Sequence, residues 1–160
     1  TLIQGGGEEW LSQYPLRLNS AQLGSVILTT QKGSMEIHAQ YTERVLPNNE
    51  LEVDEEGNLV YDIAVTVNGE EWTVDGLDGL ADRFYQTKAA GRMSADYAWQ
   101  DMQPRWTLEL TTVYGQTRTV SGYRVDPFTD ALVVDGVMLQ YVHSEAIQMA
   151  LGELAEKIIF

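Results

Sequence analysis

Two tight-turn dipeptides, each placed after a strand-like run and ahead of a helix-like run, constrain this chain more than any other feature. Apolar residues recur at every second position from Leu59 to Val67, Asn68-Gly69 follows, and Glu70–Val74 comes next. A period of two predicts a strand with one buried face, and Asn-Gly is favoured in the type I′ turns of hairpins. The second dipeptide, Asp135-Gly136, has the same surroundings. The sequence therefore predicts two compact hairpins.

A helix pattern follows each hairpin, with apolar residues spaced three and four positions apart. The first stripe comprises Leu77, Leu80, Ala81 and Phe84, and the second comprises Ile147, Ala150, Leu151, Leu154, Ala155 and Ile158. We expect helices near 76–90 and 144–157. Asp75 and Ser144 are the expected N-caps, because their side-chain oxygens can accept hydrogen bonds from free backbone N–H groups.

Strand signals also open each half of the chain. Val26–Thr30 precedes a turn and an alternating run from Met35 to Thr42, and Trp106–Thr111 precedes a glycine turn and Thr117–Val125. We expect a single α+β domain over residues 1–160, with a mainly antiparallel sheet built of hairpins and two helices on one side of it.

The two halves share one order of elements: hairpin, hairpin, helix. Residues 18–91 and 105–158 bound the two units, so the order predicts a diverged β-β-β-β-α duplication. The alternative is coincidence, because antiparallel α+β chains often repeat such an order.

The excess of acids excludes several classes of partner. The formal charge is −14, from 24 acidic and 10 basic residues. Phosphate backbones and anionic membranes repel such a chain, so we expect no nucleic-acid partner. Cysteine is absent, which excludes disulfides and thiolate metal sites, and no apolar run approaches the length of a membrane span.

The first residues bear on localisation. The chain begins at Thr1 and continues into Gln4-Gly5-Gly6-Gly7. This start is typical of a processed or truncated N-terminus, although a cleaved tag leaves the same trace. It favours an extracytoplasmic or cell-surface protein.

The second half resembles a known family. The run Arg105-Trp106-Thr107-Leu108-Glu109-Leu110, followed by Tyr114-Gly115, Tyr123, Val133-Val134-Asp135-Gly136-Val137 and Tyr141-Val142-His143-Ser144, is similar to the C-terminal part of a bacterial family of unknown function. That family occurs in extracytoplasmic, lipoprotein-type proteins, including auxiliary components beside some ABC transporters. The similarity covers roughly residues 72–154 and rests on pattern and turns; the family's glycine- and proline-containing link is matched only by Pro104. It implies a surface-associated, non-catalytic domain and assigns no functional residue.

Motifs for catalysis, cofactors and metals are not found in the sequence. It holds no Gly-x-Ser-x-Gly and no glycine-rich phosphate loop, and its two histidines, His38 and His143, lack the spacing of a metal site. The acidic stretch from Glu50 to Asn58 is expected to be a solvated loop, and its Asp54–Asn58 run does not match a calcium loop. We expect no cofactor and no metal.

Acids beside aromatic residues leave one enzymatic alternative open. Carbohydrate-active enzymes use pairs of carboxylates, and three acids lie near aromatic residues in the sequence. These acids are Asp96, Asp101 and Glu109, near Tyr97, Trp99 and Trp106. With so many acids in the chain, some fall near aromatic residues by chance.

The irregular segment from Arg92 to Pro104 is the best candidate for a contact surface. Long irregular connections in compact domains are often functional. The candidate binding residues are Tyr97, Trp99, Met102 and Trp106. If Trp99 is exposed, Trp99→Ala should leave the melting temperature nearly unchanged; the alternative is that Trp99 and Met102 plug the end of the sheet.

Taken together, these features favour a non-enzymatic binding module with an unknown protein or glycan partner. A carbohydrate-active enzyme and a purely structural domain of a larger assembly remain the alternatives.

Overall fold

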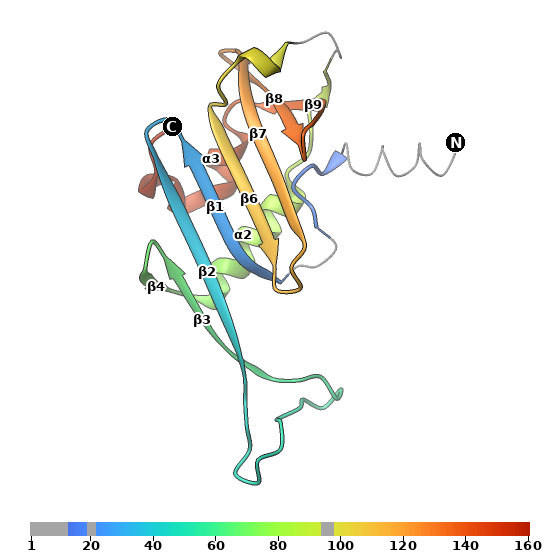
Figure 1. The fold of residues 1–160 in the computed structure, drawn as a ribbon, viewed down its shortest axis with the longest axis vertical. Coiled ribbons are helices and arrows are strands. Elements are labelled where there is room, and N and C mark those ends of the chain that lie inside the picture. Colours follow the sequence, from blue (N-terminus) through green and yellow to red (C-terminus); the bar gives the residue numbers. More distant parts are fainter. Residues whose placement is uncertain (1–12, 19–21, 94–97) are drawn as a thin grey trace, which may run out of the picture.

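The computed structural model describes residues 13–18, 22–93 and 98–160. Within these residues nine strands form one antiparallel sheet, in the order β4-β3-β2-β1-β6-β7-β8-β9-β5 (Figure 1). The strands are β1 (Leu23–Thr30), β2 (Gly33–Glu43), β3 (Tyr61–Val67), β4 (Glu70–Trp72), β5 (Gly91–Arg92), β6 (Trp106–Thr112), β7 (Thr117–Asp126), β8 (Thr129–Val134) and β9 (Val137–His143). The chain is thus mostly antiparallel sheet with a small helical part, as the hairpin pattern predicted.

Both tight turns have the backbone conformation that their sequences favour. Asn68 and Gly69 have φ of 51° and 85°, and Asp135 and Gly136 have φ of 49° and 86°. Positive φ at both central residues is the signature of a type I′ turn, whose twist matches that of the strands it joins. The sequence prediction of two compact hairpins is confirmed.

The helices are shorter than expected, and their N-caps differ from the prediction. α2 spans Val74–Gln86, and its N-cap is Thr73, whose hydroxyl accepts a hydrogen bond from the Gly76 N–H. Asp75 was wrong as a cap because the helix begins one residue before it. α3 spans only Ala146–Leu151 and continues as the 3₁₀ helix η2 (Gly152–Lys157). Ser144 was also wrong as a cap, since its hydroxyl donates to the carbonyl of Pro127.

Both helices lie behind one face of the sheet in the view of Figure 1. The expected helical stripes are buried there, with Leu80, Phe84, Leu151 and Leu154 fully inaccessible. They pack on alternate residues of the central strands, which are Val26, Leu28, Met35, Ile37, Trp106, Leu108, Leu110 and Val120. The burial of this one continuous core is the main source of stability.

Among the described residues, a second apolar cluster lies at one side of the opposite face. The 3₁₀ turn η1 (Trp99–Asp101) and Met93 pack there on Tyr123, Ala131 and Val133, which form a second, small apolar cluster. The neighbouring strands β1, β2 and β6 present mainly polar side chains on this face, with Ile27 of β1 among them.

Candidate functional site

The connection between β2 and β3 is an ordered projection rather than a slack loop. Residues 44–60, here called the arm, extend beyond the end of the sheet (Figure 1). Three hydrogen bonds close its base in a ring: the Arg44 N–H donates to the Val60 carbonyl (3.1 Å), Val60 to Glu52 (3.0 Å), and Glu52 back to Arg44 (2.8 Å). The arm therefore holds its shape with backbone bonds of its own.

Two tight turns form the tips of the arm. In the first, Asn48 Oδ1 accepts from the Glu50 N–H (3.1 Å). In the second, Asp54 Oδ1 accepts from the N–H groups of Glu56 and Asn58, each at 2.9 Å. These hydrogen bonds, that from Asn58 first, hold the pKa of the Asp54 carboxyl below its ordinary value. The acidic run thus serves as a turn built around Asp54.

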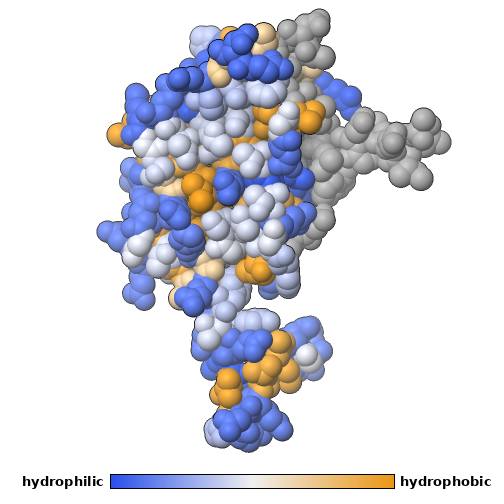
Figure 2. All heavy atoms as spheres, viewed as in Figure 1, coloured by the Kyte–Doolittle hydropathy of each residue, from blue (hydrophilic) through white to orange (hydrophobic). Residues whose placement is uncertain are grey.

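The arm exposes aliphatic side chains that its own small size cannot bury. Two bridged pairs, Val45 with Leu51 and Val53 with Leu59, line it. Together with Leu46 these side chains are 37–60% exposed. Figure 2 shows them gathered as an apolar patch among hydrophilic residues, separate from the body of the molecule.

The arm is not needed to join its strands. β7 and β8, which occupy the same place in the second half of the element order, are joined by residues 127–128 alone. Loop-closure entropy makes a longer connection inexpensive but gives no reason to order it. The arm is therefore much longer than the connection between β7 and β8, and its aliphatic side chains are exposed.

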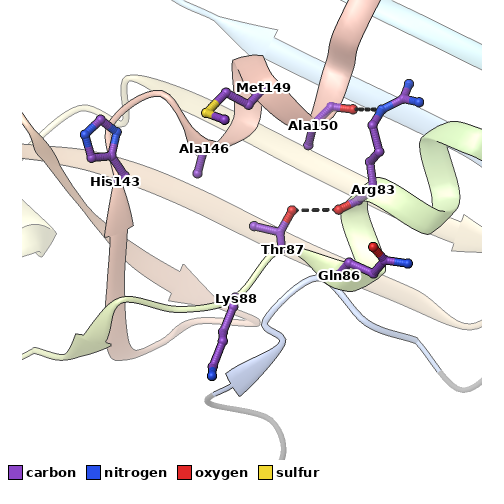
Figure 3. Close-up of a pocket in the computed structure, with 8 residues that line it drawn as sticks. All are labelled: Arg83, Gln86, Thr87, Lys88, His143, Ala146, Met149 and Ala150. Carbon is purple, nitrogen blue, oxygen red and sulfur yellow. Dashed lines mark hydrogen bonds between the residues drawn. The ribbon is translucent and has the colours of Figure 1, made fainter.

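A shallow groove lies where α2 and α3 meet (Figure 3). Its volume is about 330 Å³, and its lining comprises Arg83, Gln86, Thr87, Lys88, His143, Ala146, Met149 and Ala150. The Arg83 Nε donates to the carbonyl of Ala150 (2.7 Å), which ties the two helices together. Met149 is 72% exposed, so the groove has an apolar surface open to solvent.

The groove carries the charge of Lys88, whereas the guanidinium of Arg83 lies beyond its end, near Gly79 and Gly152 (Figure 3). None of its lining residues is an acid, although the chain holds 24. Within the part of the chain that the structure describes, neither Arg83 nor Lys88 is in an ion pair, whereas Arg44 and Arg105 are. His143 is exposed and adds a further polar group, and its Nδ1 atom accepts from the Glu145 N–H (3.3 Å). The groove suits a ligand with negative charge and an aliphatic part.

The candidate binding residues of the Arg92–Pro104 segment are placed differently from one another. Tyr97 lies outside the described residues. Trp99 is half-buried, with its ring centroid 5.8 Å from that of Tyr123, and Met102 is 39% exposed. Because Trp99 packs on the sheet, this placement favours a loss of stability in Trp99→Ala over the nearly unchanged stability expected for an exposed side chain.

Trp106 lies in the core, 1% exposed, and takes part in a buried polar network. Its indole N–H donates to Asp130 Oδ2 (3.2 Å), and Arg105 donates to the same oxygen from Nε (3.2 Å) and Nη2 (2.8 Å). Arg124 Nε lies 3.6 Å from the other carboxylate oxygen. Met102, Arg105 and Arg124 also line a depression of about 360 Å³. Trp106 does not line this depression and is linked to it only through the Asp130 oxygen that it shares with Arg105.

Of the acids considered for sugar chemistry, Glu109 and Asp101 lie on different elements and both are exposed. Glu109 alternates with Trp106 and Leu108 along β6, so it projects from the opposite face of the sheet and is exposed. Asp101 is exposed at the end of η1, and Asp96 lies outside the described residues. His38 also lies on the exposed face, beside Glu36.

Comparisons with protein-family models, with curated proteins and with solved structures found no match. Among the described residues, no helix has the length and apolar character needed to cross a membrane.

The sequence analysis missed both the arm as a structure and the groove. For the arm, a signal was present, because Leu51 and Val53 alternate with the acids and tight-turn residues flank them. The groove had no such signal, because its residues come from α2, β9 and α3 and meet only in the folded chain.

Proposed function

We propose that this chain is a non-enzymatic interaction module that binds a protein partner through the arm. The observation that carries the proposal is an ordered projection with five aliphatic side chains that are 37–60% exposed. Exposed apolar patches rimmed by polar residues are typical of protein interaction sites. The preformed shape lowers the entropy lost on binding.

The chemistry of the arm favours a protein over a glycan. Residues 44–60 include no aromatic residue, so they offer no ring on which a sugar can stack. Full burial of an aliphatic side chain is worth about 1.5–3 kcal/mol, so burial of five that are about half exposed offers roughly 5 kcal/mol before the costs of association. A complementary apolar surface can supply that burial.

We also infer that the two halves arose by duplication of a β-β-β-β-α unit. The two halves have the same order of elements, which is β1-β2-β3-β4-α2 in the first and β6-β7-β8-β9-α3 in the second. In the sheet, β1 and β6 lie side by side at the centre, and the later strands of each half follow in order toward the two edges. The equivalent turns Asn68-Gly69 and Asp135-Gly136 support the same inference. On this view the arm is a later addition to one copy of the unit. An extracytoplasmic, surface-associated setting, which the family resemblance implies, remains part of the proposal.

The first experiment removes the arm. Replacement of residues 45–59 by Asn-Gly leaves the hydrogen-bonded pair Arg44 and Val60 to flank a two-residue turn, as a similar pair does at Asn68-Gly69. Because the arm makes its bonds within itself, we expect the melting temperature to change by no more than about 4 °C, the equivalent of roughly 1 kcal/mol. Loss of folding would mean that the arm is structural and would refute the proposal.

The second experiment identifies what the arm contacts. A photo-crosslinking residue placed at Leu51 should give a discrete protein adduct in the source cells, and one placed at Glu36 on the sheet face should not. An adduct with another protein or with a second copy of the chain supports the proposal. If Leu51 gives none, or the same products as Glu36, the arm is not an interaction surface.

A further inference from the structure

The arm and the α2–α3 groove are complementary to each other. The arm carries five carboxylates and one arginine, a net charge of −4, around its aliphatic side chains. The groove presents Lys88 and the exposed Met149, with no acid in its lining. Arg83 lies at the end of the groove, and its guanidinium reaches Gly79 and Gly152 in a neighbouring depression that Asp75 and Glu153 also line. Each surface thus offers the charge and the apolar contact that the other lacks.

The two surfaces lie in different parts of the molecule. The arm projects from the end of β2 and β3, whereas the groove lies between the helices on the covered side of the sheet (Figures 1 and 3). Within one chain the aliphatic side chains of the arm stay exposed. An occupant of the groove with the chemistry of the arm must therefore come from another molecule.

We propose that the arm of one copy docks in the α2–α3 groove of a second copy. The proposal rests on the arm being an interaction surface and adds the identity of its partner. The acidic tips approach Lys88, and the pairs Val45–Leu51 and Val53–Leu59 cover Met149. Because the two contact surfaces differ, the interface is heterologous, and each copy keeps one free arm or one free groove.

Association through this contact is weak. The arm has fewer residues than the 20–30 that each side of a standard interface contributes. Two chains of charge −14 also repel each other, although the Debye length of about 8 Å at physiological ionic strength confines most of that repulsion to close approach. We therefore expect a monomer at low concentration and larger species as concentration rises.

The test uses two complementary variants and one control. An arm variant carries Leu51→Ser and Val53→Ser, and a groove variant carries Lys88→Glu and Met149→Ser. All four side chains are exposed, so the fold should be retained, which thermal unfolding checks. Phe128→Ser is the control, because Phe128 is 71% exposed but belongs to neither surface.

Sedimentation velocity over a wide concentration range gives the readout. The weight-average mass of the wild type and of Phe128→Ser should rise with concentration, and each double variant alone should remain a monomer. An equimolar mixture of the arm and groove variants should form a heterodimer and nothing larger, because one intact arm and one intact groove remain between them.

Three results would overturn the proposal: a wild type that stays monomeric throughout, a control as defective as the double variants, or a mixture that fails to associate. A monomeric wild type whose Leu51 position still crosslinks to a different protein would refute docking to a second copy alone. The arm would then keep its proposed function with another partner.

Discussion

Removal of the buried carboxylate at Asp130 should destabilise the fold more than any change to the surface ion pairs. Asp130 is 1% exposed, and one of its oxygens receives three donors, two from Arg105 and one from the Trp106 indole. In Asp130→Ala the Arg105 guanidinium, only 18% exposed, loses its counter-charge, and the indole N–H loses its acceptor.

The expected loss of folding stability in Asp130→Ala comes from breaking the ion pair with Arg105. Removal of one partner of a buried ion pair costs about 3–5 kcal/mol, because the remaining charge stays buried without compensation. For a domain of this size, 1 kcal/mol corresponds to about 2–4 °C in melting temperature, so Asp130→Ala should lower it by roughly 6–20 °C. Asp130→Asn, which keeps an acceptor oxygen, should lower it by less.

A matched control is available at the base of the arm. Asp62 pairs with Arg44 at 3.4 Å, but their side chains are 75% and 48% exposed. Exposed pairs contribute up to about 1 kcal/mol, so Asp62→Ala should change the melting temperature by only a few degrees. Calorimetry or fluorescence-monitored unfolding measures both. Equal effects at Asp130 and Asp62 would refute the reasoning that burial makes the difference.

Three further predictions concern other parts of the fold. Gly122→Ala should cost about 1–3 kcal/mol in thermal unfolding, because the added Cβ would lie 2.3 Å from the Trp106 ring. Burial raises the pKa of Tyr85 to about 12, against 10 when unperturbed. The contribution of its neutral phenol to stability is therefore intact below pH 10 and is lost as pH rises through 12. In an ultraviolet titration, the Tyr85→Phe variant should lack the tyrosine that ionises at this high pH. The pKa of Asp54 is lowered, so the order of its turn is present above the ordinary pKa of 3.8 and is lost as pH falls through the lowered pKa. Faster amide hydrogen exchange at Asn58 should report this loss. The Asp54→Asn variant should show the same faster exchange at neutral pH.

Local patterns determined which parts of the fold could be predicted. The turns at Asn68-Gly69 and Asp135-Gly136 depend on two adjacent residues, and they form as expected. The helical stripes, such as Leu80 with Phe84, also follow from spacing alone. The N-cap of α2 was predicted less well than the turns and the helical stripes. Thr73 and Asp75 both have side chains that suit an N-cap, and the residue at which β4 ends decides which of them takes that position.

The candidate surface was harder to predict because exposure depends on residues distant in sequence. Trp99 lies in an irregular segment, yet Tyr123 in β7 covers part of it. Trp106 belongs to the core through Asp130, which lies in β8. In the first hairpin, Leu59 and Tyr61 continue the apolar face of Val65 and Val67 but are 37–38% exposed.

The arm shows how a chain can keep an apolar surface ordered without burying it. Its order comes from the hydrogen-bond ring of Arg44, Glu52 and Val60 and from the turns built on Asn48 and Asp54, none of which needs contact with the core. The five carboxylates of the arm keep it soluble, because they surround the aliphatic pairs with charge. On the proposed function those charges also restrict the partner: an acidic surface would be repelled, whereas a surface with a basic group beside an apolar one would gain from both components of the arm.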